Sequence, residues 1–284
     1  MIPDRQDPWD GIYTSTITPL RPDFSLDEAA LGEHFRATAS VDGIVGILCN
    51  GHAGDDDGVN AENSLEAAEH GSDAAKAGAD AVMVFAPYSW ALSQDRAAAV
   101  RHHRIVAEAA GLPLMLFFGS VGAGQTAYRP ELVADLARLP GVVAVKEGSW
   151  ETARYEANRR LVRDVAPHVR VMASGDEHLF SCYVLGSEGS LVSLAELVPE
   201  AIVALDRAVR RGDLKAARAA HETIYPLARA IYGVPPGSHA TARLKTCLKL
   251  LGRLRHDAVR PPIGPLEAEE VNLLRDALRA AKLL

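Results

Sequence analysis

The sequence predicts an α/β protein, a parallel (β/α)8 TIM barrel followed by a helical C-terminal extension. Short apolar, β-branched runs alternate with amphipathic helical stretches as far as residue 194, which is the pattern of βα units in a parallel sheet. Polar or glycine-rich residues follow almost every run, at the edge where barrel enzymes place their chemistry. No G-x-G-x-x-G follows the first strand, so a doubly wound dinucleotide-binding sheet is disfavoured.

Each expected strand is an apolar run bounded by turn residues. The strands are expected at residues 12–18, 43–49, 81–85, 114–118, 142–147, 169–173 and 189–194. The helices are expected at residues 26–40, 62–77, 94–110, 130–138, 152–166, 177–185, 199–211, 214–231, 241–251 and 267–282. Ser25 and Glu28 have the spacing of a capping box for the first helix, Gly78 is a candidate C′ residue of the second, and the strand at 43–49 is expected to be buried.

Composition indicates an ordinary globular enzyme. The 284 residues are 48% hydrophobic, and the net charge of -7 argues against a nucleic-acid or anionic-membrane partner. No apolar stretch is long enough to span a membrane, and the first ten residues do not resemble a signal peptide. Cys49, Cys182 and Cys247 form no CxxC and are expected to be buried, reduced cysteines of a cytoplasmic protein. The adjacent His102 and His103 are expected on a solvated helix face rather than in a metal site.

One strand ends on a lysine, and this is the candidate centre of the chemistry. Val142–Glu147 reads VVAVKE, so the ammonium of Lys146 follows four apolar residues. Burying that charge is costly unless it is paired or neutralised, and a lysine driven toward neutrality is a nucleophile that forms a Schiff base with a ketone. The alternative is a structural lysine that reaches solvent or pairs with Glu147 or a neighbouring strand.

With these residues in view, the chain resembles the dihydrodipicolinate synthase / N-acetylneuraminate lyase family. The matching segments are Thr16–Leu20 (TITPL), Asn50–Asp55 (NGHAGD), Ala86–Trp90 (APYSW), Val142–Ser149 (VVAVKEGS), Ser174–Glu177 (SGDE) and the glycines around Gly189. The resemblance implies a class I aldolase barrel, with Lys146 as the Schiff-base lysine. It also implies no metal or organic cofactor, and a homo-oligomer, either a dimer or a tetramer.

Several departures from the family pattern bear on the reaction. The second-strand loop of the family carries two threonine hydroxyls, where this chain has His52 and Ala53. After its fourth strand the family usually has a tyrosine as its second aromatic residue, where this chain has Ser89. After the fifth strand, Phe117 or Phe118 replaces the tyrosine that shuttles protons in the family. The arginine of the synthase branch has no match, so we expect an enzyme other than dihydrodipicolinate synthase. His52 is then a candidate proton shuttle, because its ordinary pKa suits transfer near neutrality.

We therefore expect a Schiff-base lyase or aldolase that acts on pyruvate or another small 2-oxo acid. A dehydratase using the same imine, and a catalytically impaired barrel that only binds a small oxo or sugar acid, are the alternatives. The expected catalytic residues are Lys146 and His52, and no metal ligands are expected. Substrate binding is assigned to Gly51, Ala53, Gly54, Asp55, Ser89, Phe117, Gly175 and Leu191.

The length between the second and third strands is short for this family. One helical stretch lies between Cys49 and Ala81, where the family has a helix, a strand and a further helix. A βα unit takes about 30 residues, so one unit is predicted to be missing after the second strand, between Asp55 and Gly58. The barrel is expected over residues 1–211, and the helical extension over 212–284.

Overall fold

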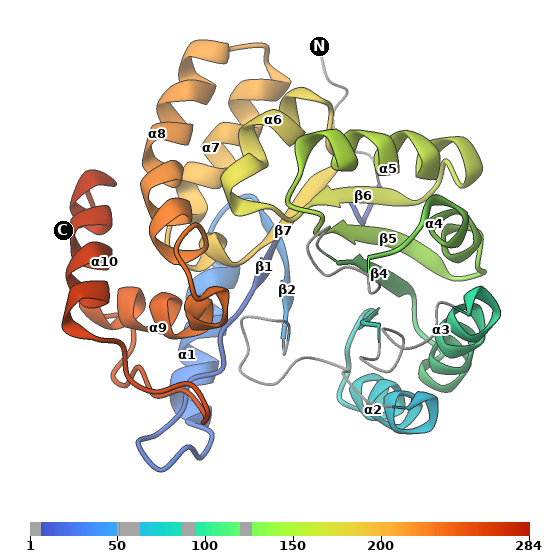
Figure 1. The fold of residues 1–284 in the computed structure, drawn as a ribbon, viewed down its shortest axis with the longest axis horizontal. Coiled ribbons are helices and arrows are strands. Elements are labelled where there is room, and N and C mark those ends of the chain that lie inside the picture. The colour runs from blue at the N-terminus through green and yellow to red at the C-terminus, as the bar shows by residue number, and fades with distance from the viewer. Residues whose placement is uncertain (1–6, 50, 52–62, 87–94, 120–126) are drawn as a thin grey trace. The chain divides into compact units, whose positions relative to one another are not determined.

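The computed structural model describes residues 7–49, 51, 63–86, 95–119 and 127–284 (Figure 1). The chain divides into two compact units, and β7 (Gly189–Val192) contributes to both. The first unit comprises Met1–Arg5, Gly11–Asp57 and Leu191–Leu284. The second comprises Gln6–Asp10 and Gly58–Ser190. The expected boundary at residue 211 falls within the first unit and stays a prediction.

In the first unit, two parallel strands are joined by a helix and followed by the C-terminal helices. β1 (Gly11–Ser15) pairs in parallel with β2 (Ile44–Leu48), and the strand order is β2-β1-β7. Glu196, in the 3-10 turn after β7, accepts a hydrogen bond from the backbone of Ile17, and so fixes the chain that leaves β1. The helices are α1 (Glu28–Ala39), α7 (Pro199–Arg210), α8 (Leu214–Ile231), α9 (Ala240–Leu250) and α10 (Ala268–Ala280).

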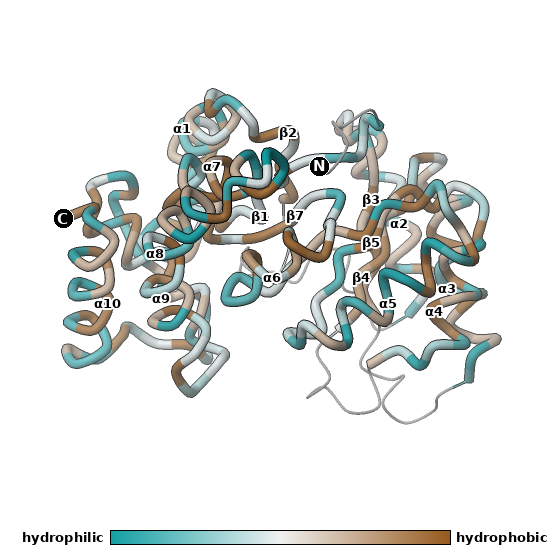
Figure 2. The backbone as a smooth tube through the Cα atoms, turned by 90° about the horizontal axis from the view of Figure 1, so that it is seen from above, coloured by the Kyte–Doolittle hydropathy of each residue, from teal (hydrophilic) through white to brown (hydrophobic). Residues whose placement is uncertain are grey.

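In the second unit, a parallel sheet has the order β7-β6-β5-β4-β3. The strands are β3 (Val82–Val84), β4 (Leu114–Phe118), β5 (Val142–Glu147) and β6 (Arg170–Ala173). The helices are α2 (Ser64–Lys76), α3 (Arg96–Ala110), α4 (Pro130–Ala137), α5 (Thr152–Val165) and α6 (Leu179–Val184). Strands β4 and β5 are hydrophobic, whereas α5 carries hydrophilic stretches (Figure 2). This is the distribution expected where amphipathic helices cover a buried parallel sheet.

The pairing of β2 and β3, which stand at the two ends of the strand order, agrees with a missing βα unit between them. Within the described residues, β2 pairs only with β1, and β3 pairs only with β4. The described residues between β2 and β3 contain a single helix, α2. The expectation that β2 is buried is wrong, because a strand with one partner leaves much of its surface uncovered, and Val45 is 49% exposed. Cys49, which follows β2, is likewise exposed rather than buried, whereas Cys182 and Cys247 are buried, and all three are free.

Two predictions, the capping box at Ser25 and the C′ residue Gly78, concern helix ends that the structure describes. Asp27, and not Ser25, caps α1, because the Asp27 carboxylate accepts a hydrogen bond from the backbone N–H of Ala30. The Ser25 hydroxyl donates instead to Asp23, which forms its own turn before the helix. Gly78 follows the C-cap of α2 with a φ of +91°, which confirms it as the C′ residue.

The histidine pair on α3 is buried, and the expectation of a solvated face is wrong. His102 and His103 are 2% and 0% exposed. His102 Nδ1 lies 3.0 Å from the Ser64 hydroxyl of α2, and His103 Nδ1 lies 2.9 Å from the Ala99 carbonyl oxygen. The pair is buried because α2 packs directly on α3. Burial lowers the pKa of both imidazoles to about 4.

A buried arginine ties the C-terminal helices together. Arg243 of α9 is 1% exposed and donates hydrogen bonds to the carbonyl oxygens of Ile231, Val234 and Pro235. It also pairs with Glu270 of α10 at 2.6 Å. One guanidinium therefore satisfies carbonyl groups at the end of α8 and fixes α10, which an alkyl side chain could not do. Across the described ranges, no helix is both long enough and apolar enough to cross a membrane.

The substitution Arg243→Ala should lower the free energy of unfolding by about 3 kcal/mol, because it leaves buried acceptors without a donor. The matched control is Arg279→Ala, which removes an exposed pair with Asp276 and should cost less than about 0.5 kcal/mol. Urea denaturation of the two variants measures the difference. Equal losses in the two variants would contradict the role assigned to Arg243.

Stability should also depend on pH through the buried histidines. Their folded-state pKa lies below the ordinary value of 6.5, so the unfolded chain binds more protons and stability falls as the pH drops from about 6.5 toward about 4. The maximal slope is about 1.4 kcal/mol per pH unit for each histidine. His103→Gln should reduce this slope in denaturation curves at pH 7 and pH 5. Leu65→Ala, at an exposed apolar residue of α2, is the control and should leave the slope unchanged.

Candidate active site

The site is built on the C-terminal end of β5. Lys146 is 5% exposed, and the strand pairs it with Phe117 of β4 on one side and Met172 of β6 on the other. Residues paired in a parallel sheet point to the same face, so the three side chains form one layer. The strand prediction for residues 142–147 is confirmed to the residue.

The layer around the amine is apolar. The Nζ atom of Lys146 lies 5.6 Å from the centroid of the Phe117 ring. The Phe85 ring, just after β3, lies 4.8 Å from that of Phe117, centroid to centroid. Met172 is fully buried on the other side. The side chains that flank the amine in its own layer thus offer little compensation for a positive charge beyond the face of an aromatic ring.

Burial changes the titration of the amine. Desolvation lowers the pKa of Lys146 from 10.5 to about 8, and the carboxylate of Asp176 opposes this by favouring the ammonium. At pH 7 a pKa of about 8 leaves about a tenth of the amine neutral, against about one in 3,000 for an ordinary lysine. Asp176 is itself 3% exposed and begins the 3-10 turn after β6. Burial with a lowered pKa is what the interpretation of Lys146 as a reactive amine requires.

Glu147 does not pair with Lys146, because successive residues of a strand point to opposite faces. Its carboxylate accepts a hydrogen bond from Asn158 of α5 at 2.8 Å and another from the Ser149 hydroxyl at 2.9 Å. Burial raises the pKa of this carboxyl, against the effect of those donors. These contacts join the end of β5 to α5 and to the turn that follows. They hold the backbone that carries Lys146 from the opposite face of the strand.

Two glycines close the turns beside the site. A Cβ atom on Gly148 would lie 2.9 Å from both the Phe117 ring and the Phe118 carbonyl oxygen, so a side chain there would displace the aromatic wall. A Cβ atom on Gly175 would lie 3.3 Å from the His178 ring. Gly148 in particular lets the Phe117 ring lie against the end of β5.

The structure places some of the predicted site residues and leaves others open. Lys146, Phe117 and Gly175 belong to the second unit, and the first two share one layer. Gly51 and Leu191 belong to the first unit and are buried there. A Cβ atom on Gly51 would lie 2.8 Å from the Ser15 hydroxyl oxygen, so the position has no room for a larger residue. The remaining predicted residues, His52, Ala53, Gly54, Asp55 and Ser89, lie outside the described residues.

Sequence reasoning missed Phe85, Met172 and Asp176. Phe85 and Met172 are apolar residues of apolar runs, and only the register of the sheet brings them beside the amine. Asp176 could have been found, because it follows Gly175 in the SGDE segment, and a carboxylate after a strand end is a natural partner for a lysine after the neighbouring one. The structure also resolves an ambiguity, since Phe117 faces the amine, whereas Phe118 packs against Tyr128 with ring centroids 5.6 Å apart.

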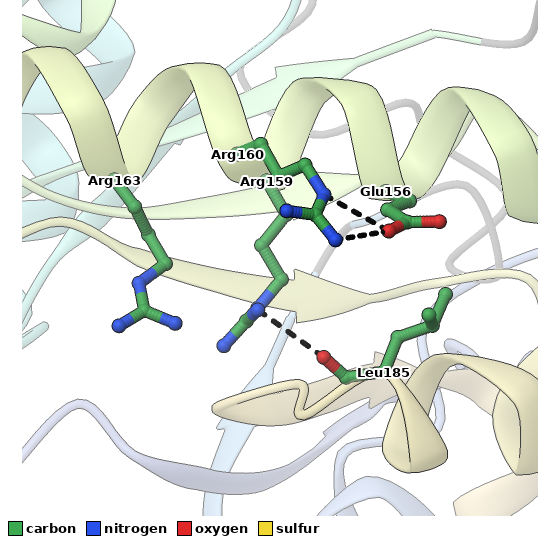
Figure 3. A pocket seen from close by; sticks show the side chains of 5 residues that line it. All are labelled: Glu156, Arg159, Arg160, Arg163 and Leu185. Atoms are coloured by element: carbon green, nitrogen blue, oxygen red, sulfur yellow. Dashed lines mark hydrogen bonds and ion pairs between the residues drawn. The ribbon is translucent and has the colours of Figure 1, made fainter.

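A pocket of about 430 Å³ lies on α5, apart from the predicted site residues (Figure 3). Its lining residues are Glu156, Arg159, Arg160, Arg163 and Leu185. Most of its charge is already neutralised, because Arg160 pairs with Glu156, and Arg159 pairs with Glu188 and donates to the Leu185 carbonyl oxygen. The Arg159 guanidinium therefore holds α5 against the segment around Leu185 and Glu188. The residues that line the pocket include no candidate nucleophile.

A buried lysine with a lowered pKa, at the carboxyl end of a parallel strand, is the arrangement that a lysine-dependent aldolase or synthase on an α/β barrel requires. A model of the dihydrodipicolinate synthetase family matches residues 57–281. The chain belongs to this family of lyases and synthases.

Two relatives and one solved structure show the range of the family. The putative 2-dehydro-3-deoxy-D-gluconate aldolase YagE of Escherichia coli is 30% identical over 80% of this chain and 72% of its own. The 4-hydroxy-tetrahydrodipicolinate synthase of Methanothrix thermoacetophila is 28% identical over 94% of this chain and 95% of its own. The crystal structure of YagE with pyruvate, at 25% identity, covers 97% of this chain and 99% of its own with a TM-score of 0.86. That similarity confirms the barrel fold predicted from the sequence.

The alignment with the Methanothrix enzyme also bears on the missing unit. It spans 297 positions but uses 94% of 284 residues, which is about 267, so about 30 positions of the relative have no counterpart in this chain. That is the length of one βα unit. The family model begins its match at residue 57, inside the interval where the sequence predicts the deletion.

The carboxylate of Asp176 should control the pKa of the Lys146 amine. Asp176→Asn removes a carboxylate that favours the ammonium, so the pKa of Lys146 should fall below about 8 and the amine should react at lower pH. Competitive acetylation with peptide mapping measures this pKa directly. The exposed Asp164→Asn on α5 is the control and should change nothing. A rise in the Lys146 pKa in Asp176→Asn would contradict the assignment.

Proposed function

We propose that this protein is a Schiff-base lyase or aldolase that uses Lys146 on pyruvate or another small 2-oxo acid. The observation that carries the proposal is the desolvated amine, held in an apolar layer with a pKa of about 8. An amine of this kind attacks a ketone without a metal or an organic cofactor. Membership of a family of aldolases and synthases supports the same reaction class.

The proposed mechanism proceeds through an imine. Neutral Lys146 adds to the C2 carbonyl, water leaves, and a protonated imine forms. This cation withdraws electrons from the neighbouring carbon, so a C–C bond to that carbon can be broken or made through an enamine. The carboxylate of Asp176 favours positive charge at Lys146 and would stabilise the iminium as it stabilises the ammonium.

Phe117 bears on which reaction of the family this protein catalyses. It stands beside the amine, where the resemblance places the proton-shuttling tyrosine, and its ring carries no exchangeable proton. This supports an enzyme other than dihydrodipicolinate synthase. His52 is proposed to carry the proton instead, and the backbone N–H groups of Gly51–Gly54 are proposed to bind the substrate carboxylate.

An imine also supports β-elimination of water, so a dehydratase is the second candidate function. The observation that favours it is again Phe117, because elimination from the enamine does not require a base on the hydroxyl that a retro-aldol step must deprotonate. The homo-oligomer, the cytoplasmic location and the domain boundary near residue 211 stay predictions from sequence.

Trapping of the imine tests the proposal. Incubation with pyruvate and sodium borohydride should add one reduced pyruvyl group, and peptide mapping should place it on Lys146. The yield should rise with pH toward about 8, as the amine loses its proton. Lys146→Ala should give no adduct there. Lys76→Arg, at an exposed lysine of α2, is the matched control and should trap normally.

A folded wild-type protein that forms no adduct with pyruvate, glyoxylate or 2-oxobutyrate would exclude the imine mechanism. Modification of many surface lysines at equal yield would show that Lys146 has no special reactivity. Either outcome leaves the family assignment intact and favours a barrel that only binds its ligand.

A further inference from the structure

We propose that the Lys146 site also decarboxylates 3-oxo acids, and that short dicarboxylates with a 2-oxo group are its substrates for this reaction. The proposal rests on the imine described above. The observation behind the proposal is that the buried Lys146 is surrounded in its layer of the sheet by apolar side chains. These are Phe117, Phe85 and Met172.

Aldol cleavage and decarboxylation differ in the proton transfers that they require. To break an aldol C–C bond, a base must remove the proton of the substrate hydroxyl while the iminium accepts the electron pair. The side chains of the Lys146 layer cannot do this, since Phe117 replaces a phenol by a benzene ring and neither Phe85 nor Met172 carries a transferable proton. Loss of CO₂ from a carboxylate requires no proton to be removed. The same iminium can therefore drive decarboxylation without the base, proposed above to be His52, that a retro-aldol step needs.

The steps balance without an oxidant, a reductant or a metal. Lys146 and the ketone form an iminium and release one water. The bond between the α-carbon and the carboxylate then breaks, its electron pair forms the enamine, and neutral CO₂ leaves. The enamine takes one proton from solvent at carbon, and one water hydrolyses the resulting iminium to free Lys146 and the ketone product. The net change is the 3-oxo carboxylate plus one proton giving the ketone and CO₂.

The surroundings of the amine favour this step. The carboxylate of a 3-oxo acid would lie within two carbons of the imine carbon, and so beside the layer that holds Phe117 and Phe85. The faces of these rings are electron-rich and offer a carboxylate no hydrogen bond, whereas neutral CO₂ is tolerated there. The anionic charge is therefore destabilised in the ground state, and the positive charge on nitrogen is supported by Asp176.

The substrate must carry both a 2-oxo acid group and a carboxylate that can leave as CO₂. A 2-oxo acid matches the proposed function, and a second carboxylate on the carbon next to the ketone makes the same molecule a 3-oxo acid. Oxaloacetate is the smallest molecule with both features, and its decarboxylation gives pyruvate. A plain 3-oxo acid such as acetoacetate lacks the first carboxylate and should be a poorer substrate.

The test uses the full chain with oxaloacetate in buffer that contains EDTA, because free divalent metals decarboxylate this acid by themselves. Pyruvate and CO₂ are both measured. We expect saturable, enzyme-dependent release in the wild type, loss to the buffer rate in Lys146→Ala, and full activity in Lys76→Arg. Circular dichroism melts establish that the variants are folded. A wild-type rate equal to that of Lys146→Ala would overturn the proposal.

Trapping with pyruvate separates this proposal from the one on which it rests. A protein that forms the borohydride adduct on Lys146 but leaves oxaloacetate unchanged would refute the decarboxylase and leave the Schiff-base lyase standing. A protein that forms no adduct would refute both.

Phe117→Tyr tests the proton argument itself, because it adds one hydroxyl to the layer. With 2-dehydro-3-deoxy-D-gluconate as the retro-aldol probe, the ratio of retro-aldol to decarboxylation rates should rise in this variant. An unchanged or lower ratio would show that Phe117 does not direct the site toward decarboxylation.

Discussion

The amine of Lys146 lies inside the protein, and the free energy needed to desolvate its charge shapes the surrounding structure. Phe117 and Met172 flank it in the sheet, so the ammonium loses water. Among the described residues it gains in return the face of the Phe117 ring and the opposing carboxylate of Asp176. A fully paired lysine in this position would hold its proton and would not react at neutral pH. The apolar layer and the carboxylate act in opposite directions, and their balance sets the pKa near 8.

The opposite face of β5 explains why the lysine can stay in this position. Glu147 points away from the amine and is held by Asn158 of α5 and by Ser149 in the following turn. Gly148 leaves space for the Phe117 ring between these groups and the end of β4. The two faces of β5 therefore differ in function. On one face the charge of Lys146 is poorly compensated, and on the other the polar contacts of Glu147 hold the strand backbone in place. A buried polar cluster of this kind rigidifies a strand only when its donors and acceptors are matched, as they are for the Glu147 carboxylate.

The strand that carries Lys146 could be predicted from sequence, whereas the residues around the amine and the exposure of β2 could not, for a common reason. The β5 run and Lys146 were predictable, because apolar periodicity and a single lysine are local features. Met172 and Phe85 were not, because their role depends on the register between strands far apart in sequence. Burial of β2 was predicted wrongly for the same reason, since the apolar run is typical of a central strand, whereas the structure leaves Val45 half exposed. The choice of Asp27 over Ser25 as a cap depended on which of two adjacent turns each side chain joined.

The described residues that surround the amine all follow the predicted deletion in the sequence. Phe85, Phe117, Lys146 and Met172 come from four consecutive strands, β3 to β6 or the residue after them, and Asp176 follows the last of these strands. All of these residues lie in the second unit, after the interval in which the βα unit is predicted to be missing. The groups that lower the pKa of Lys146 and the group that opposes them are therefore encoded together, between residues 82 and 176. Because desolvation acts over short distances, a shortened barrel can keep a reactive lysine even where its other strand ends have changed.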